Sequence, residues 1–352
     1  MSSFVPLASR LAGYGDRPAI VDPDGSWSFA AVDDDAARLA GVLHAAHAVG
    51  DRVAILCTPG HDFVVALMAC WQAGAIAVPL HPQHPDAELR YALDDSEVSA
   101  VVSSAVHRDM AARVAAVQGV GVVDVVAPAD GPSWRSTPPP EQPALMIYTS
   151  GTTGRPKGVV HTHGSLAAQV DGMVAAWEWV PDDRIVLVLP LNHVHGIVNV
   201  TLCPLAVGAC CEAPGSFDAP ALWERFASGD VTVFMAVPTV YARLVSAWEA
   251  APDETRLRWS AGAAGLRLMV CGSAALPVST LERWQELTGH VLLERYGMSE
   301  LGMALSNTLT KRVPGHVGEP FPGVEVRVVG DGGEDVAEGQ PGELLVRGPQ
   351  VF

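Results

Sequence analysis

Short apolar runs alternate with longer amphipathic stretches over the first 125 residues. The short runs predict buried strands and the longer stretches predict helices. Strands are expected at residues 18–21, 53–57, 75–79, 99–103 and 121–126, and helices at 28–48, 61–73 and 86–94. Ser28 has the side chain of a helix N-cap, and Gly74 suits a helix C-cap. This alternation predicts a parallel sheet covered by helices on both faces.

A second alternating block follows a connection at 127–143 that is rich in Pro, Ser, Asp and Gly. Its strands are expected at 185–189, 207–211, 231–237, 266–271 and in a segment that ends at Leu293, and its helices after Gly196, from Thr239 and from Pro277. After residue 315, Gly, Pro and Val dominate, and short strands are expected at 324–329 and 343–346. Tight turns between short strands indicate the start of a small β-barrel.

The predicted fold class is therefore α/β. Two parallel-sheet αβ subdomains are expected to pack as αβαβα layers, followed by an incomplete β-barrel subdomain. The expected boundaries are 1–180, 181–314 and 315–352.

Composition narrows the function. Of the 352 residues, 49% are hydrophobic and 17% are charged, which is typical of a folded globular protein. The formal net charge of −17 argues against non-specific binding to nucleic acid or to an anionic membrane, because those partners attract clustered Lys and Arg. No run reaches the ~18 uninterrupted apolar residues that a membrane span requires.

The cysteines lack C-x-x-C spacing and are mostly flanked by apolar residues; they are Cys57, Cys70, Cys203, Cys210, Cys211 and Cys271. We predict buried free thiols in a reducing compartment, with zinc ligation and disulfides as the alternatives. The N-terminus lacks a basic segment followed by an apolar core, so no secretory signal is predicted. Together these features predict a cytoplasmic protein.

The sharpest motif is Tyr148-Thr149-Ser150-Gly151-Thr152-Thr153-Gly154-Arg155-Pro156-Lys157-Gly158, which follows an apolar run. Glycines let backbone N–H groups turn inward around an anion, hydroxyls add donors, and Lys157 adds a compact positive charge. The motif predicts a polyphosphate-binding loop. A P-loop kinase or GTPase is disfavoured, because Pro156 precedes the lysine and Gly158 leads into another apolar strand rather than a helix.

Four further blocks follow in order: Pro190-Leu191-Asn192-His193-Val194-His195-Gly196, Gly272-Ser273-Ala274-Ala275-Leu276-Pro277, Tyr296-Gly297-Met298-Ser299-Glu300 and Gly342-Glu343-Leu344-Leu345-Val346-Arg347-Gly348-Pro349. Together with the loop, the set resembles the adenylate-forming superfamily of acyl-CoA synthetases, peptide-synthetase adenylation domains and firefly luciferase. The resemblance covers residues from about 15 to the end. It implies attack of a carboxylate on the α-phosphate of ATP, giving acyl-AMP and pyrophosphate, and then transfer of the acyl group to a thiol.

The resemblance also implies roles for individual residues. Catalytic roles fall on Lys157, His193, Ser299 and Glu300, and Glu300 would ligate Mg²⁺. Nucleotide contacts fall on Thr149, Ser150, Gly151, Thr152, Thr153, Gly154, Lys157, Gly272, Ser273, Ala274, Ala275, Glu294, Tyr296, Gly297, Met298 and Ser299. Acid-binding roles fall on His193, His195, Arg243, Ser273 and Arg295.

Arg295 bears on the identity of the acid. A guanidinium between nucleotide and acyl group would bind a second carboxylate through two parallel hydrogen bonds. Arg295 and the His193-Val194-His195 block resemble the malonyl-CoA and methylmalonyl-CoA synthetase branch, and Arg243 resembles its second carboxylate-binding arginine. The expected substrate is malonate, methylmalonate or a larger substituted malonate.

Three alternatives stay open at this point. The acid is either a malonate or another carboxylic acid. The acceptor thiol belongs either to coenzyme A or to a carrier protein, and the chain is either catalytic or a nucleotide-binding module derived from a ligase. Members of the family continue for roughly 150 residues with a mobile domain that carries a catalytic lysine. The resemblance therefore predicts that this chain binds ATP and acid but activates the acid weakly.

Overall fold

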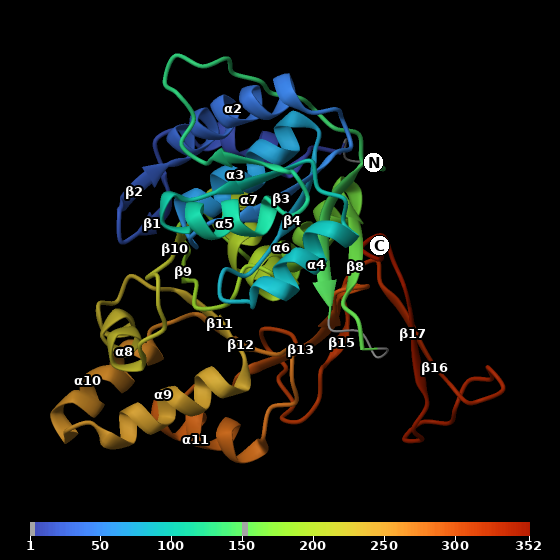
Figure 1. Cartoon of the computed structure of the whole chain (residues 1–352). Helices are drawn as coiled ribbons and strands as arrows, with labels where there is room; N and C mark the ends of the chain where they lie inside the picture. Colours follow the sequence, from blue (N-terminus) through green and yellow to red (C-terminus); the bar gives the residue numbers. More distant parts are fainter. Residues whose placement is uncertain (1–3, 150–153) are drawn as a thin grey trace.

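The computed structural model describes residues 4–149 and 154–352, and its centre is a pair of β-sheets with helices between and outside them (Figure 1). The smaller sheet has six strands in the order β6 (Gly121–Asp124), β5 (Ala100–Ser103), β3 (Arg52–Leu56), β4 (Ile76–Pro79), β7 (Pro143–Thr149) and β8 (Lys157–Thr162). Every pair in it is parallel except β7 with β8.

The larger sheet has nine strands in the order β15 (Glu319–Pro320), β14 (Gly302–Ser306), β13 (Leu293–Met298), β12 (Leu268–Cys271), β11 (Val233–Ala236), β9 (Arg184–Val186), β10 (Cys210–Glu212), β1 (Pro18–Asp22) and β2 (Gly25–Ser28). Its central pairs are parallel, whereas β2, β14 and β15 run antiparallel to their neighbours. The parallel, helix-covered sheets confirm the predicted fold class.

The two sheets do not divide the chain at one point. β1 and β2 lie near the N-terminus, yet β1 pairs with β10 and so belongs to the larger sheet. The predicted subdomain boundary near residue 180 remains a prediction. It does not separate the strands of the two sheets, because β1 and β2 precede it and belong to the larger sheet.

The helices form three layers around the sheets. They are α1 (Leu7–Arg10), α2 (Phe29–Ala46), α3 (His61–Ala73), α4 (Asp86–Asp95), α5 (Arg108–Ala115), α6 (His163–Ala176), α7 (Cys203–Val207), α8 (Ala219–Ala227), α9 (Pro238–Ala250), α10 (Asp253–Ala264) and α11 (Val278–Thr288), with short 3₁₀ turns at Leu11–Tyr14 and Ala105–His107 and a π-helix, η3, at His195–Leu202.

Helices α3 and α6 lie between the sheets, because each contacts strands of both. Every residue of α3 from Phe63 to Ala73 is buried, as expected for a helix that is apolar on all sides. Outside the sheets, α4 and α5 pack on the smaller one and α8 to α11 on the larger one. This arrangement is the predicted αβαβα order.

Local sequence signals are confirmed at two helix ends. The Ser28 hydroxyl accepts a hydrogen bond from the Ala31 amide at the start of α2. Gly74 ends α3 with φ +82°, a left-handed conformation that glycine adopts without strain. All six cysteines are buried free thiols, also as predicted.

The last segment forms an antiparallel hairpin of β16 (Glu325–Val329) and β17 (Glu343–Arg347), which projects away from the two sheets (Figure 1). These strands confirm the predicted ones at 324–329 and 343–346. They form a two-stranded sheet, and no closed barrel occurs in the part of the chain that the structure describes. Among the same residues, no helix is both long and apolar enough to cross a membrane.

A charged cluster holds the start of α3 against α2 and the β1–β2 turn. The His61 ring lies 3.0 Å from Asp35 and 3.7 Å from Asp62, and it stacks on Trp27 with ring centroids 4.5 Å apart. Asp22 accepts a hydrogen bond from the His61 amide. Burial alone would lower the pKa of His61, but hydrogen bonds to the two carboxylates outweigh it and raise this pKa to about 9.

This cluster makes the stability of the fold depend on pH. Because the His61 pKa is raised, its stabilisation is complete below about pH 6.5 and is lost as the pH rises through about 9. We expect His61→Gln to be less stable than wild type at pH 6 by on the order of 2 kcal/mol, and the gap to shrink by pH 10. Urea unfolding of both proteins at each pH measures this. A gap that is equal at both pH values would contradict the charged state of His61.

Candidate functional site

One cavity of about 770 Å³ lies where several strands of both sheets end. It is lined by Thr149, Lys157, Leu189, Pro190, His193, Val194, His195, Gly196, Val237, Ser273, Arg295, Gly297, Met298, Ser299, Glu300 and Met303. The carboxyl ends of parallel strands are the usual ligand-binding edge of an open α/β sheet. The cavity therefore collects side chains from the phosphate-loop motif and from the motifs at 190–196, 272–277 and 296–300, whereas the block at 342–349 does not line it.

The predicted phosphate loop connects β7 to β8. Thr149, the last residue of β7, pairs with Lys157, the first residue of β8, and both line the cavity. Ser150, Gly151, Thr152 and Thr153 lie outside the described residues. The two ends of the loop thus place a hydroxyl and a cation in the cavity.

Helix α4 holds both ends of this loop, which the sequence did not predict. The Tyr148 hydroxyl donates to Asp95 at 2.8 Å, and the Tyr91 hydroxyl donates to the Pro156 carbonyl at 3.0 Å. Burial, together with the Asp95 carboxylate, raises the pKa of Tyr148, so its hydroxyl stays protonated. The available signal was the i, i+4 spacing of Tyr91 and Asp95, which places both on one face of α4.

Ser299 and Glu300 occupy the tight turn between β13 and β14. The turn is closed by pairing of Met298 with Gly302, and it directs Ser299 and Glu300 into the same cavity as Lys157. Mg²⁺ binds proteins through one or two carboxylates and takes its remaining ligands from water and phosphate. One carboxylate in the same cavity as Lys157, the lysine predicted to bind phosphate, fits that pattern. Among the described residues, no group of three or more His, Cys, Asp or Glu side chains could hold a metal ion by itself.

Arg295, on β13, lies at another part of the cavity wall. Its side chain is 3% exposed, and one guanidinium nitrogen donates to the Ser273 hydroxyl at 3.3 Å. Its Nε has no hydrogen-bond partner, and no carboxylate of residues 4–149 or 154–352 forms an ion pair with it. Burial lowers the pKa of Arg295 to about 10, so it remains a cation at neutral pH.

Gly272 makes room for that cation. A Cβ at position 272 would lie 2.6 Å from the Arg295 Nε, so a larger residue would displace the guanidinium. Ser273 follows with φ +68°, a conformation that is strained for a residue with a side chain. The predicted Gly272-Ser273 motif thus shapes the pocket around Arg295.

The two predicted histidines differ in environment. His193 is exposed to the cavity, whereas His195 is buried and its Nδ1 lies 3.1 Å from the Ser273 hydroxyl. Burial, and next to it the positive charge of Arg295, lowers the pKa of His195 well below its ordinary value. His195 is therefore neutral at physiological pH.

Several predicted site residues do not line the cavity. The buried Glu294 carboxylate accepts a hydrogen bond from the Gly315 amide at 2.7 Å, so it is occupied by the loop after β14. Ala274 and Ala275 are exposed on the chain that leads to α11, and the Tyr296 hydroxyl lies 3.9 Å from the Met298 sulfur.

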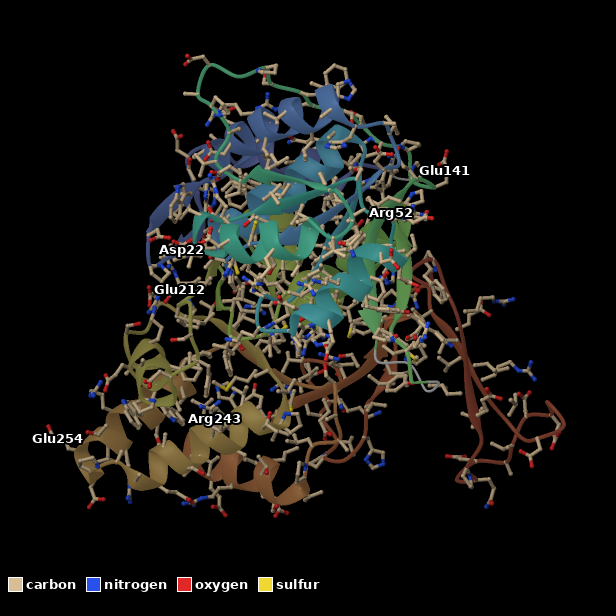
Figure 2. All side chains as sticks on the ribbon, viewed as in Figure 1. Asp22, Arg52, Glu141, Glu212, Arg243 and Glu254 are labelled. Carbon is tan, nitrogen blue, oxygen red and sulfur yellow. The ribbon has the colours of Figure 1, made fainter. Side chains whose placement is uncertain are left out.

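Arg243 is the clearest departure from the prediction. It lies on the exposed face of α9, with its guanidinium carbon 4.3 Å from the centre of the Phe217 ring (Figure 2). The structure does not bring it to Arg295, because helix periodicity directs Tyr241 and Leu244 into the core and Arg243 outward. A carboxylate-binding role for Arg243 stays a prediction without geometric support.

A second cavity of about 270 Å³ adjoins the first. Its wall combines residues around α4 with the phosphate hairpin: Pro79, Leu80, His81, His84, Glu88, Leu89, Tyr91, Ala92, Tyr148, Thr149, Pro156, Asn192 and His193. Thr149 and His193 belong to both cavities. A group in the second cavity would therefore meet a group in the first beside these two side chains.

This fold and this site define an adenylate-forming α/β enzyme. A family model described as AMP-binding enzyme matches residues 7–352. The chain is 42% identical to the mitochondrial malonate–CoA ligase ACSF3 of Bos taurus, an alignment that covers 99% of this chain and 66% of the relative. The chain thus spans about two thirds of the length of that relative.

Solved structures agree. Apo MatB from Rhodopseudomonas palustris matches with a TM-score of 0.87 and 33% identity, over 99% of this chain and 70% of that one. A malonyl-CoA ligase in a ternary product complex with methylmalonyl-CoA and AMP matches with a TM-score of 0.86 and 35% identity, over 99% and 72%. The chain belongs to the AMP-binding enzyme family and, within it, to the AMP-forming acid–thiol ligases.

The tyrosine contacts around α4 lead to a prediction. We expect the double variant Tyr91→Phe, Tyr148→Phe to bind MgATP about three- to tenfold more weakly, because each lost hydrogen bond contributes about 0.5–1.5 kcal/mol to the position of the loop. Calorimetric titration measures this. Tyr14→Phe is the matched control, since its hydroxyl also donates to a backbone carbonyl, that of Ala206, in another part of the fold. Equal MgATP affinity in the double variant and wild type would contradict the proposed support of the loop.

Proposed function

We propose that this chain carries the acid- and nucleotide-binding part of an ATP-dependent ligase that activates a short dicarboxylic acid, malonate or a substituted malonate, for transfer to coenzyme A. The observation that carries the substrate class is the buried Arg295 cation. A charge out of water is costly unless an opposite charge compensates it. A second carboxylate on the acid supplies that charge.

Both ends of such an acid have a place in the cavity. Arg295 and the neutral His195 both contact Ser273 and offer hydrogen bonds to one carboxylate, and Lys157, Thr149 and the Ser299–Glu300 turn line the same cavity. A dicarboxylate held by Arg295 would direct its second carboxylate toward the nucleotide. A monocarboxylate would leave the guanidinium buried without a counter-charge.

The first step forms a bond between a carboxylate oxygen and the α-phosphorus of ATP, and it breaks the bond from that phosphorus to the bridging oxygen of pyrophosphate. In this proposal Lys157 neutralises charge on the β- and γ-phosphates, and Ser299 donates to the α-phosphate. A Mg²⁺ ion held by Glu300 would supply further charge neutralisation on the phosphates. Orientation of the acid by Arg295 lowers the entropic cost of the attack.

In the second step a thiol sulfur attacks the acyl carbon, AMP leaves with its phosphate oxygen, and the thiol proton passes to solvent. The cavity beside α4 supports this step, because it meets the acid site at Thr149 and His193. Its lining is mainly apolar near Leu80 and Leu89, which suits the uncharged arm of a thiol acceptor. Coenzyme A is the proposed acceptor, and a carrier-protein thiol would use the same opening.

The test is calorimetry in the presence of MgATP, with malonate, methylmalonate, acetate and octanoate as ligands. We expect the two dicarboxylates to bind and Arg295→Ala to weaken them roughly 10- to 100-fold, the effect of losing a hydrogen-bonded charge pair of about 1.5–3 kcal/mol. ATP affinity should stay within about twofold, because the hydrogen bond that Arg295 makes is to Ser273 and not to Lys157 or the Ser299–Glu300 turn. Arg283→Ala is the matched control, since Arg283 is a half-buried arginine of α11 that pairs with Glu249 outside the cavity.

Equal binding of monocarboxylates, or unchanged malonate affinity in Arg295→Ala, would dismiss the dicarboxylate proposal and leave the family assignment intact. Arg243→Ala decides the open role of the second arginine. A loss of malonate affinity would assign it to acid binding, and unchanged affinity would limit it to its contact with Phe217.

A further inference from the structure

The turn that carries Ser299 and Glu300 is short, and its own strands fix it only at the base. β13 ends at Met298 and β14 begins at Gly302, so the residues between them have no sheet partner. For a carboxylate to share a metal ion with phosphates held by another segment, the two segments must keep a fixed separation. The contacts that fix this turn therefore matter for metal-dependent nucleotide binding.

His161, on β8, makes the closest such contact. Its Nε2 lies 2.7 Å from the Ser299 carbonyl oxygen. A carbonyl can only accept a hydrogen bond, so Nε2 carries the proton and Nδ1 is free to accept. Nδ1 lies 3.4 Å from the side-chain nitrogen of Gln169 and 3.5 Å from the Ser165 hydroxyl. The ring is fully buried, so these contacts hold it in one orientation.

The same strand carries Lys157. Side chains two residues apart on a strand point to the same face, so Lys157, Val159 and His161 share one face of β8. Lys157 reaches the cavity from the start of the strand, and His161 reaches the Ser299 carbonyl four residues later. One rigid strand thus connects the phosphate-binding lysine to the turn that bears Glu300.

Gln169 of α6 supports the imidazole from behind. Its side-chain nitrogen also lies 3.4 Å from the Gln350 carbonyl. Gly302, which has φ +62°, packs against Gln169 so closely that a Cβ there would lie 2.4 Å from the amide carbon. The far side of the turn is held by the Phe352 amide, which donates to the Glu300 carbonyl at 3.3 Å. The His161 contact is therefore part of a packed network.

We infer that His161 is a positioning residue that sets the distance between Lys157 and Glu300, and so governs how much Mg²⁺ strengthens nucleotide binding. The inference rests on the proposed nucleotide site. It assigns to His161 no contact with substrate or metal. His161 acts on the turn through its hydrogen bond to the Ser299 carbonyl oxygen. A side chain at position 161 without a hydrogen-bond donor cannot form this bond.

The experiment compares ATP affinity in Mg²⁺ and in EDTA, by calorimetry, for wild type, His161→Leu and His161→Gln. In His161→Leu we expect the Mg²⁺-dependent gain in affinity to fall about three- to tenfold, with affinity in EDTA within about twofold, because one hydrogen bond to the turn is lost. In His161→Gln the gain should return to within about twofold of wild type, because the amide nitrogen of Gln can donate as Nε2 does.

His163→Leu is the matched control. His163 is also buried, two residues along the chain, but its ring meets Trp71 edge-on at 5.6 Å and does not contact the turn. His163→Leu should lower the stability of the fold but leave the Mg²⁺-dependent gain in ATP affinity unchanged. An unchanged gain in His161→Leu, an equal loss in His163→Leu, or a failure of His161→Gln to restore it would each overturn the inference. Absence of ATP binding by wild type would overturn the proposed function as well, and this result is distinct from the other three.

Discussion

Two sheets share one layer of buried helices, and this shared layer determines where a site can form. α3 and α6 contact strands of both sheets, so neither sheet can shift without exposing apolar helix surface. The consequence is that strand ends from different sheets meet at one cavity. β7 and β8 of the smaller sheet bring Thr149 and Lys157, and β13 of the larger sheet brings Arg295. The site is thus a product of how the sheets pack on common helices.

That packing also separates two kinds of positive charge. Lys157 is accessible to the cavity and to solvent, where a polyphosphate can enter, whereas Arg295 is buried behind Ser273. An exposed lysine costs little when it has no ligand, but a buried guanidinium is costly without an opposite charge. The difference is consistent with the two roles proposed above, in which Lys157 binds the polyphosphate of ATP and Arg295 selects among acids.

Local sequence patterns predicted most of the strands and helices, because apolar periodicity reports burial directly. They did not predict that β1 and β2 would join the larger sheet, since strand pairing between distant segments leaves no local pattern. The motifs brought Lys157, His193, Arg295 and Glu300 to one cavity as expected.

The site residues that the sequence placed wrongly or overlooked each have a physical explanation. Glu294 stands beside Arg295 in the sequence, yet alternate side chains of a strand point to opposite faces, and its carboxylate meets Gly315 instead of the cavity. Arg243 depends on the rotation of α9 about its axis, which core packing of Tyr241 and Leu244 decides. His161 contacts the Ser299 turn through a backbone carbonyl and carries no chemical signature in the sequence, and the only signal for Tyr91 was its spacing from Asp95.

The Ser273 conformation shows how the acid-binding wall is held together. A non-glycine residue at φ +68° costs on the order of 1 kcal/mol or more. Its hydroxyl is bonded to Arg295 at 3.3 Å and faces His195 at 3.1 Å, so two neighbours hold the strained residue in place. Because burial, and next to it the charge of Arg295, lowers the pKa of His195 and keeps it neutral, the imidazole can bond the hydroxyl without adding a second buried positive charge. The cation, the strained serine and the neutral histidine therefore depend on one another, and a substitution at any of the three changes the environment of the other two.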